Sequence, residues 1–146
     1  MKVLVINGPN LNLLGEREPN VYGSDSLQKI NEGLEQEAKS GGHEIEFFHS
    51  NSEGGIIDKL HAARLGFDGV ILNAGAYTHY SYAIRDAIAA IKIPVIEVHL
   101  SNVNSSDEFR KTRVIAPVCV GSRAGFGKRS YYLGLKALEY IVGDDR

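Results

Sequence analysis

Short apolar runs alternate with helical patterns along the whole chain, and this alternation limits the possible folds more than any other feature. The runs are rich in Val and Ile and contain few polar residues, which is typical of strands buried on both faces. Amphipathic stretches between them predict helices that cover both faces of a parallel sheet. We predict strands at residues 2–7, 43–50, within 67–76, at 93–101 and at 114–121.

Capping residues and glycines predict where the helices begin and end. Ser50 and Glu53 have the spacing of a capping box and predict a helix that ends at Gly66. Ser81 is placed to cap the next helix, and the last helix is predicted over residues 128–142.

These elements predict one α/β domain over residues 1–146, with the doubly wound strand order 2-1-3-4-5. Pro117 lacks an N–H group, which favours an edge position for the fifth strand. The net charge of −2 provides no basic surface for nucleic acid or anionic lipid. Cys119 is the single cysteine, so an internal disulfide is excluded, and no apolar stretch is long enough to span a bilayer. We expect a cytoplasmic protein.

Polar side chains collect where the predicted strands end. In such a sheet, ligands bind beyond the carboxyl ends of the strands, at the switch between strands 1 and 3. The candidates are Asn7, Asn10, Arg17 and Tyr22 after the first strand, Asn73, Thr78 and His79 after the third, Glu97, His99, Ser101 and Asn102 at the end of the fourth, and Ser122 and Arg123 after the fifth. We expect the loops after strands 1, 3 and 4 to meet in space.

The first of these loops is long. Residues 8–24 separate the first strand from its helix, whereas a strand-to-helix loop commonly has about 2–6 residues. Long loops in compact domains tend to be lids or binding segments. The loop contains neither GxGxxG nor GxxxxGK[ST], so a nucleotide site of either kind is poorly supported.

The residues of this loop and of the fourth strand suggest acid–base chemistry. A guanidinium such as that of Arg17 favours the phenolate of a nearby tyrosine, which would make Tyr22 a usable base despite a reference pKa of about 10. Histidine titrates near neutral pH and can deliver a proton, so a base and an acid that face each other suit an elimination of water. Asn10 and Asn73 can donate hydrogen bonds to substrate oxygens.

Structural roles compete with these interpretations. An arginine and a tyrosine in a loop often only pack together, His99 has the position of a core histidine, and His79 could help to cap a helix. Glu97 is harder to explain in this way, because a buried carboxylate needs partners. No histidines have the HExxH spacing and no lysine is placed to face the site, so metal and Schiff-base chemistry are disfavoured. The residues alone predict an α/β domain with an acid–base site.

Three segments together closely resemble the type II 3-dehydroquinate dehydratases. They are INGPNLNLLGEREPNVYG at 6–23, ILNAGAYTHYSYAIRDA at 71–87 and IEVHLSNVNSSDEFR at 96–110, and the similarity extends from Val3 to the last helix. The resemblance implies a flavodoxin-like fold, a dodecamer built from four trimers, and no metal or organic cofactor. It also implies a hydro-lyase that converts 3-dehydroquinate to 3-dehydroshikimate and water, the third step of the shikimate pathway in aromatic amino acid biosynthesis.

The resemblance further implies roles for individual residues. Tyr22 corresponds to the base that takes a proton from C2, Arg17 to the group that favours the tyrosinate, and His99 to the acid that protonates the departing C1 hydroxyl. Glu97 would orient His99, and Asn10 would hold the water or oxygen at the enolate. The implied substrate contacts are Asn73, His79, the backbone N–H groups of Leu100 and Ser101 with the Ser101 hydroxyl, Arg110, and Asp86 reaching the site of a neighbouring subunit.

The sequence departs from the family pattern at positions outside the implied catalytic set. Tyr80 and Tyr82 replace smaller residues near an expected subunit contact, so trimer packing could differ. Residues 104–106 replace a more usual HAREE-type start, and Arg123 adds a charge after the fifth strand.

We therefore expect the loop of residues 8–24 to act as a lid that brings Arg17 and Tyr22 over a substrate held by the third and fourth loops. Three alternatives stay open. They are a binding or scaffold module without catalysis, a lyase acting on another cyclic polyol acid, and a flavoprotein, although the loop lacks the Ser/Thr-rich phosphate nest of the last. A biosynthetic and a quinate-degrading role are equally compatible with the sequence.

Overall fold

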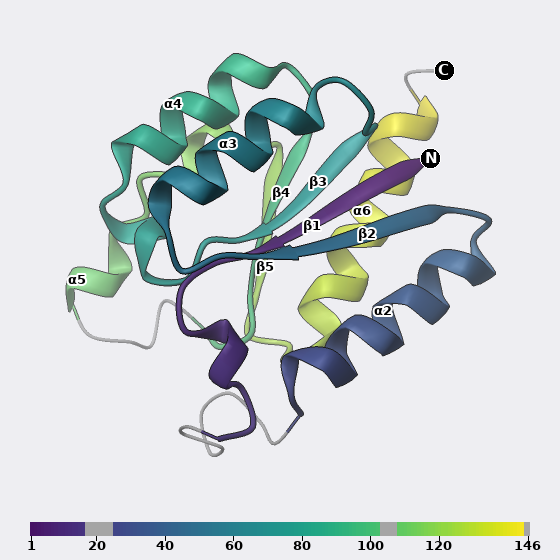
Figure 1. Ribbon diagram of the computed structural model, residues 1–146, viewed down its shortest axis with the longest axis horizontal. Coiled ribbons are helices and arrows are strands. Elements are labelled where there is room, and N and C mark those ends of the chain that lie inside the picture. Colours follow the sequence, from purple (N-terminus) through teal and green to yellow (C-terminus); the bar gives the residue numbers. More distant parts are fainter. Residues whose placement is uncertain (17–24, 103–107, 145–146) are drawn as a thin grey trace.

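Runs of Val, Ile and Leu form the inner strands of a five-stranded parallel sheet with the order β2-β1-β3-β4-β5 (Figure 1). The computed structural model describes residues 1–16, 25–102 and 108–144. Its strands are β1 (Lys2–Asn7), β2 (Glu44–His49), β3 (Gly69–Asn73), β4 (Val95–His99) and β5 (Gly121–Ala124). The predicted α/β class and the strand order 2-1-3-4-5 are confirmed.

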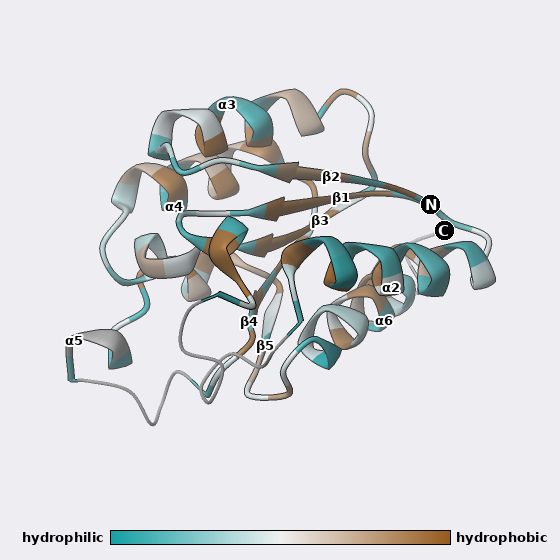
Figure 2. Cartoon of the chain, turned by 60° about the horizontal axis from the view of Figure 1, so that its bottom comes forward, coloured by the Kyte–Doolittle hydropathy of each residue, from teal (hydrophilic) through white to brown (hydrophobic). Residues whose placement is uncertain are grey.

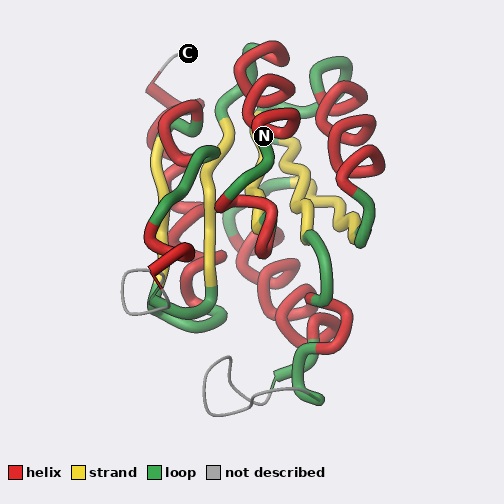
Figure 3. The backbone as a smooth tube through the Cα atoms, turned by 90° about the vertical axis from the view of Figure 1, so that its left-hand side faces the viewer, coloured by secondary structure: helices red, strands yellow, loops and turns green. Residues whose placement is uncertain are grey.

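Helices cover both faces of the sheet, as Figures 1 and 3 show from two directions. One face carries α2 (Leu27–Ser40) and α6 (Arg129–Asp144), and the other carries α3 (Glu53–Ala63) and α4 (Tyr82–Ile91). The shorter elements are η1 (Leu11–Leu13), η2 (Gly75–His79), α5 (Glu108–Lys111) and η4 (Ala116–Val118). No helix in the described part of the chain has both the length and the apolar content to cross a membrane.

Alternate residues of each strand face opposite layers of the core. Along β1, Leu4 and Ile6 pack with α3 and α4, whereas Val3 and Val5 pack with α2 and α6. The inner strands are accordingly mostly hydrophobic along their length in Figure 2. Burial on both faces explains the continuous apolar runs from which the sheet was predicted.

The prediction of a strand over residues 114–121 is wrong. Ala116–Val118 form the 3-10 helix η4 with Pro117 in its first turn, and β5 begins after it. The fixed φ of proline suits the start of a helical turn, where its missing N–H removes no ladder hydrogen bond. The chain rejoins the sheet where the Val120 N–H donates to the Val95 carbonyl at 2.9 Å. β5 lies at the sheet edge, as predicted.

The start of α3 also differs from the prediction. Its N-cap is Ser52, whose hydroxyl accepts a hydrogen bond from a backbone N–H of the first turn at 3.1 Å, so the capping box of Ser50 and Glu53 is wrong. The Glu53 carboxylate instead accepts a hydrogen bond from the Ser81 hydroxyl at 2.6 Å, which links the starts of α3 and α4. Ser81 caps α4, and this prediction is confirmed.

Two glycines let the loops after β1 and β3 cross closely. A Cβ atom at Gly8 would lie 2.7 Å from the carbonyl oxygen of Ala74, closer than real Cβ atoms approach. Gly75 has a φ of 58°, a left-handed conformation that favours glycine, and lies against Pro9. The Gly8 N–H also donates to the Asn73 carbonyl at 2.8 Å. These contacts hold the carboxyl ends of β1 and β3 together.

We expect Gly8→Ala to lower the free energy of unfolding by about 1–3 kcal/mol, because the added methyl group has no room beside the Ala74 carbonyl. Gly66→Ala is the matched control, since nothing lies within 4 Å of the Cβ that it adds. Urea unfolding of both variants measures the difference, and equal midpoints would contradict the close approach of the two loops.

Candidate active site

Polar side chains from three strands come together at the carboxyl-terminal edge of the sheet. Asn7 and Asn73 end β1 and β3 and are register partners. His99 ends β4, and Glu97 lies two residues before it; all four are buried. Alternation along the strands turns the asparagines toward the α2 and α6 side, and Glu97 and His99 toward the α3 and α4 side. The edge therefore carries two polar networks, one on each side of the sheet.

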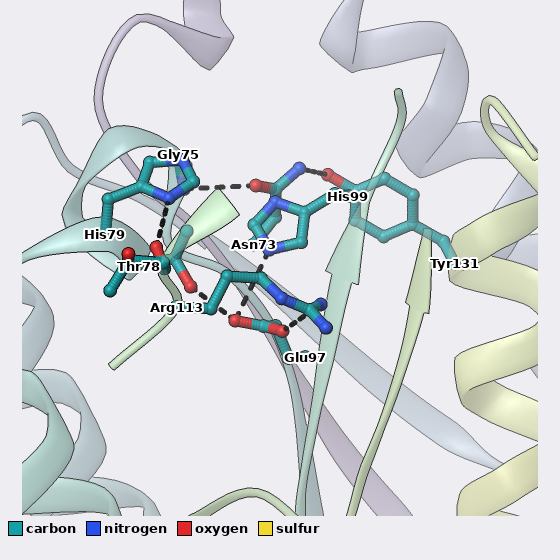
Figure 4. Close-up of polar contacts among 9 residues, drawn as sticks. Asn73, Gly75, Thr78, His79, Glu97, His99, Arg113 and Tyr131 are labelled. Carbon is teal, nitrogen blue, oxygen red and sulfur yellow. Dashed lines mark hydrogen bonds and ion pairs between the residues drawn. The ribbon is translucent and has the colours of Figure 1, made fainter. Parts of the chain in front are cut away.

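On the α6 side, Tyr131 joins the two asparagines. Its hydroxyl donates to Asn7 Oδ1 at 2.5 Å and accepts a hydrogen bond from Asn73 Nδ2 at 2.9 Å. Asn73 Oδ1 accepts from the Gly75 N–H at 3.1 Å, so both ends of this amide are engaged (Figure 4). Burial raises the pKa of the Tyr131 phenol well above its usual range and keeps it protonated. Tyr131 is thus a structural donor rather than a base.

On the other side, Glu97 is fully buried among three polar side chains. Its Oε2 accepts a hydrogen bond from Thr78 Oγ1, and its Oε1 accepts one from Arg113 Nη1 at 3.1 Å. His99 Nε2 lies 3.3 Å from Oε2, a close contact without the alignment of a directed hydrogen bond. Figure 4 shows the carboxylate between Thr78 and the guanidinium of Arg113, with the imidazole of His99 beside it.

These contacts decide the charge of Glu97. Burial raises the pKa of a carboxyl group because it disfavours the charged form, but at Glu97 the contacts with His99, Thr78 and Arg113 outweigh burial and hold the pKa below its usual range. Glu97 is therefore ionised at neutral pH. A buried carboxylate beside an imidazole orients the ring and pairs best with its protonated form. His99 can therefore act as a general acid, with Glu97 as its positioning partner.

His79 and the segment that follows α5 lie next to this network. His79 Nδ1 is 2.8 Å from the carbonyl oxygen of Thr112, and because a carbonyl only accepts, Nδ1 carries the proton. The Val114 N–H donates to the carbonyl of Thr78 at 2.8 Å. The backbone from Thr112 to Val114 is thereby held against η2.

The other predicted site residues have different surroundings. Asn10 precedes η1 with a left-handed φ of 69°, and its N–H donates to Asn51 Oδ1 at 2.9 Å. Leu100 is buried in the core on the α6 side, and Ser101 next to it is partly exposed. Asp86 lies on the exposed face of α4 and is not brought into the Glu97 network.

Part of the predicted site lies outside the described residues. Arg17 and Tyr22 belong to the range 17–24, and Arg110 lies in α5 with its side chain outside the description. Their roles, and the lid, stay predictions. Where residues are described, no three His, Cys, Asp or Glu side chains group closely enough to hold a metal ion.

Sequence reasoning missed two members of these networks. Tyr131 lies in an amphipathic helix, and the pattern there predicts that a tyrosine on the buried face is only a core residue. Arg113 lies in a polar stretch just before an apolar run, and this pattern predicts an arginine exposed to solvent. A predicted buried Glu97 does require a partner, but only the folded chain identifies which cation supplies it.

We expect Tyr131→Phe to lower the free energy of unfolding by about 1–3 kcal/mol, because it leaves the buried Asn7 Oδ1 and Asn73 Nδ2 without their shared partner. Tyr140→Phe on the same helix removes a hydroxyl from an exposed side chain and should change nothing measurable. Denaturant unfolding monitored by far-ultraviolet circular dichroism makes the comparison. A Tyr131→Phe protein as stable as the control would show that the network contributes no stability.

Acid should destabilise the protein through Glu97. Its folded-state pKa is depressed, so its stabilising effect is fully present above the usual glutamate pKa of about 4.3 and is lost as pH falls through the lower folded-state value. We expect Glu97→Gln to be less stable than the wild type at neutral pH. On acidification its free energy of unfolding should fall less steeply than that of the wild type, by up to about 1.36 kcal/mol per pH unit in that window. Unfolding free energies measured from neutral to acidic pH test this, and parallel curves would contradict it.

The comparisons with known proteins agree with one another. The family model "Dehydroquinase class II" matches residues 1–139. The 3-dehydroquinate dehydratase of Caldicellulosiruptor bescii is 56% identical over 142 residues, which cover 97% of this chain and 98% of the relative. The type II dehydroquinase structure from Butyrivibrio crossotus has a TM-score of 0.94 at 50% identity, covering 95% of this chain and 97% of that chain.

A more distant structure, the type II dehydroquinase from Propionibacterium acnes, has a TM-score of 0.90 at 34% identity and covers 97% of this chain and 96% of that chain. The match therefore extends over the sheet, all four covering helices and the loops that carry the polar networks. The chain belongs to the class II dehydroquinase family, the type II 3-dehydroquinate dehydratases.

Proposed function

We propose that the chain catalyses the dehydration of 3-dehydroquinate to 3-dehydroshikimate, the third step of the shikimate pathway, by acid–base elimination through an enolate. The observation that carries the mechanism is the contact of His99 with the buried carboxylate of Glu97, at the sheet edge where ligands bind in this fold. Family membership supports the substrate and the hydro-lyase reaction, and it disfavours a non-catalytic module and a flavoprotein.

In the proposed acid step, His99 gives a proton to the C1 hydroxyl, which leaves as water. Glu97 Oε2 lies 3.3 Å from His99 Nε2, so the negative carboxylate faces the ring of the proposed acid. Thr78 and Arg113 bind both oxygens of the carboxylate, so Glu97 stays ionised and does not take the proton itself. In this arrangement Glu97 assists the acid His99 but does not itself donate a proton.

In the proposed base step, Tyr22 removes the C2 proton as a tyrosinate that Arg17 favours. A phenol with a usual pKa of about 10 needs such a cation to act as a base at neutral pH. Asn10 would hold the water or oxygen at the enolate. The loop of residues 8–24 would close over the substrate and exclude water from the enolate.

The remaining family positions would bind the substrate. Asn73 Nδ2 has a second hydrogen besides the one donated to Tyr131, which suits a contact with a ring hydroxyl. The Leu100 and Ser101 N–H groups and the Ser101 hydroxyl would hold the carboxylate, with His79 and Arg110 on the ring oxygens. Asp86 would reach the site of a neighbouring subunit in a dodecamer of four trimers. We further propose a cytoplasmic enzyme that needs no metal or organic cofactor.

The rise in ultraviolet absorbance as dehydroquinate becomes a conjugated enone tests the proposed function. The wild type should show it, and Tyr22→Phe, which removes only the ionisable oxygen, should slow turnover by at least about a hundredfold. His99→Ala should bind substrate while turnover collapses, since the acid is lost but the other contacts stay. Turnover near the wild-type rate in either variant would refute the assigned role, and a wild type without activity would refute the function.

A further inference from the structure

Arg113 occupies a defined place beside the proposed acid. It follows α5, and its Nη1 donates to Glu97 Oε1 at 3.1 Å, with about three-quarters of the side chain covered, since 24% remains exposed. Figure 4 shows its guanidinium reaching the carboxylate from the side opposite Thr78. Arg113 thus contacts the positioning partner of His99 rather than the imidazole itself.

The backbone on both sides of Arg113 is held in place independently. The carbonyl of Thr112 accepts the His79 Nδ1 proton at 2.8 Å, and the Val114 N–H donates to the Thr78 carbonyl at 2.8 Å. These bonds connect the segment to η2, which also carries the Thr78 hydroxyl that binds Glu97 Oε2. The backbone that presents the guanidinium to Glu97 is therefore pre-arranged.

Among the groups around Glu97, Arg113 has a specific role, which is to balance the negative charge of the carboxylate. The described side chains that interact electrostatically with the carboxylate are Thr78 from η2, His99 from β4, Arg113, and Cys119 at the end of η4. Thr78 is neutral, and burial raises the pKa of the Cys119 thiol to about 12, so it is neutral too. When His99 has given up its proton, Arg113 is the cation among these groups that still balances the buried anion. A buried carboxylate without such a partner protonates more easily.

We propose that Arg113 is a positioning residue for the dehydration: it keeps Glu97 anionic and turns its Oε2 toward His99 throughout the proton transfer. The proposal rests on the proposed function, because it assigns His99 the acid role. Without the guanidinium, Glu97 could take the proton that His99 should deliver, or turn Oε1 away from its present direction.

The test compares kcat and its pH dependence in wild type, Arg113→Gln and Arg113→Lys. Arg113→Gln should lower kcat by about tenfold to a hundredfold with little change in KM, because a small misplacement of the acid weakens the chemical step. In the plot of kcat against pH, the fall at low pH (the acid limb) should move up by about one pH unit or more in Arg113→Gln. The reason is that the carboxylate loses a cation that lowers its pKa. Arg113→Lys keeps the charge and should leave the acid limb in place with partial recovery of kcat.

Arg64→Gln is the matched control, because it removes an exposed arginine at the C-terminal end of α3, at the opposite edge of the sheet. It should behave as wild type. A loss of kcat at all pH values without movement of the acid limb would show that Arg113 does not keep Glu97 anionic, and it would overturn the proposal. Wild-type kinetics for Arg113→Gln would overturn it as well.

Two further outcomes separate this inference from the proposed function. If Arg113→Gln does not fold, the folded Arg113→Lys protein decides, because an acid limb shifted as far as one pH unit would contradict a role for the charge. If wild type is active and His99→Ala is not, yet the Arg113 variants match wild type, only the role of Arg113 fails. If His99→Ala keeps its turnover, the acid assignment and the role of Arg113 fail together.

Discussion

A carboxylate buried away from water can stay ionised only if the fold supplies its partners. The network on the α3 and α4 side of the sheet meets that requirement for Glu97. Glu97 receives a hydroxyl from η2 and a guanidinium from the segment after α5, and both reach it because the backbones of the two segments are bonded to each other. His99 Nε2 lies 3.3 Å from the same carboxylate. The partners of this one carboxylate thus come from β4, from the 3-10 helix η2 and from the segment after α5.

The other side of the edge is organised by hydrogen bonds without charge. Tyr131 crosses from α6 to the ends of β1 and β3 and satisfies an amide oxygen and an amide nitrogen that would otherwise be buried without partners. Gly8 and Gly75 allow the loops after these strands to approach each other closely. The two networks are separated by the sheet itself, so the proposed acid and the asparagines are fixed by independent sets of interactions.

Much of the candidate site was predictable because parallel strands all end at the same edge. Listing the polar residues after each strand was enough to place Asn73, Thr78, Glu97 and His99 at that end of the sheet. Arg113 and Tyr131 were not predictable in this way, because each reaches the site from an element that does not end there. Sequence pattern also failed at Pro117, where an apolar run with strand composition forms a 3-10 turn, since the missing N–H of proline competes with the hydrophobic preference.

The sequence by itself determined the α/β class, the strand order and the family, because periodicity of apolar residues is a local property and the three motifs are contiguous stretches. The tertiary structure alone decided which cation faces Glu97, which hydroxyl joins the two asparagines, and where the last strand pairs. Those contacts join residues as far apart as Asn7 and Tyr131, 124 positions along the chain. Their selection depends on distances of a few ångströms between packed elements, and no local pattern encodes such distances.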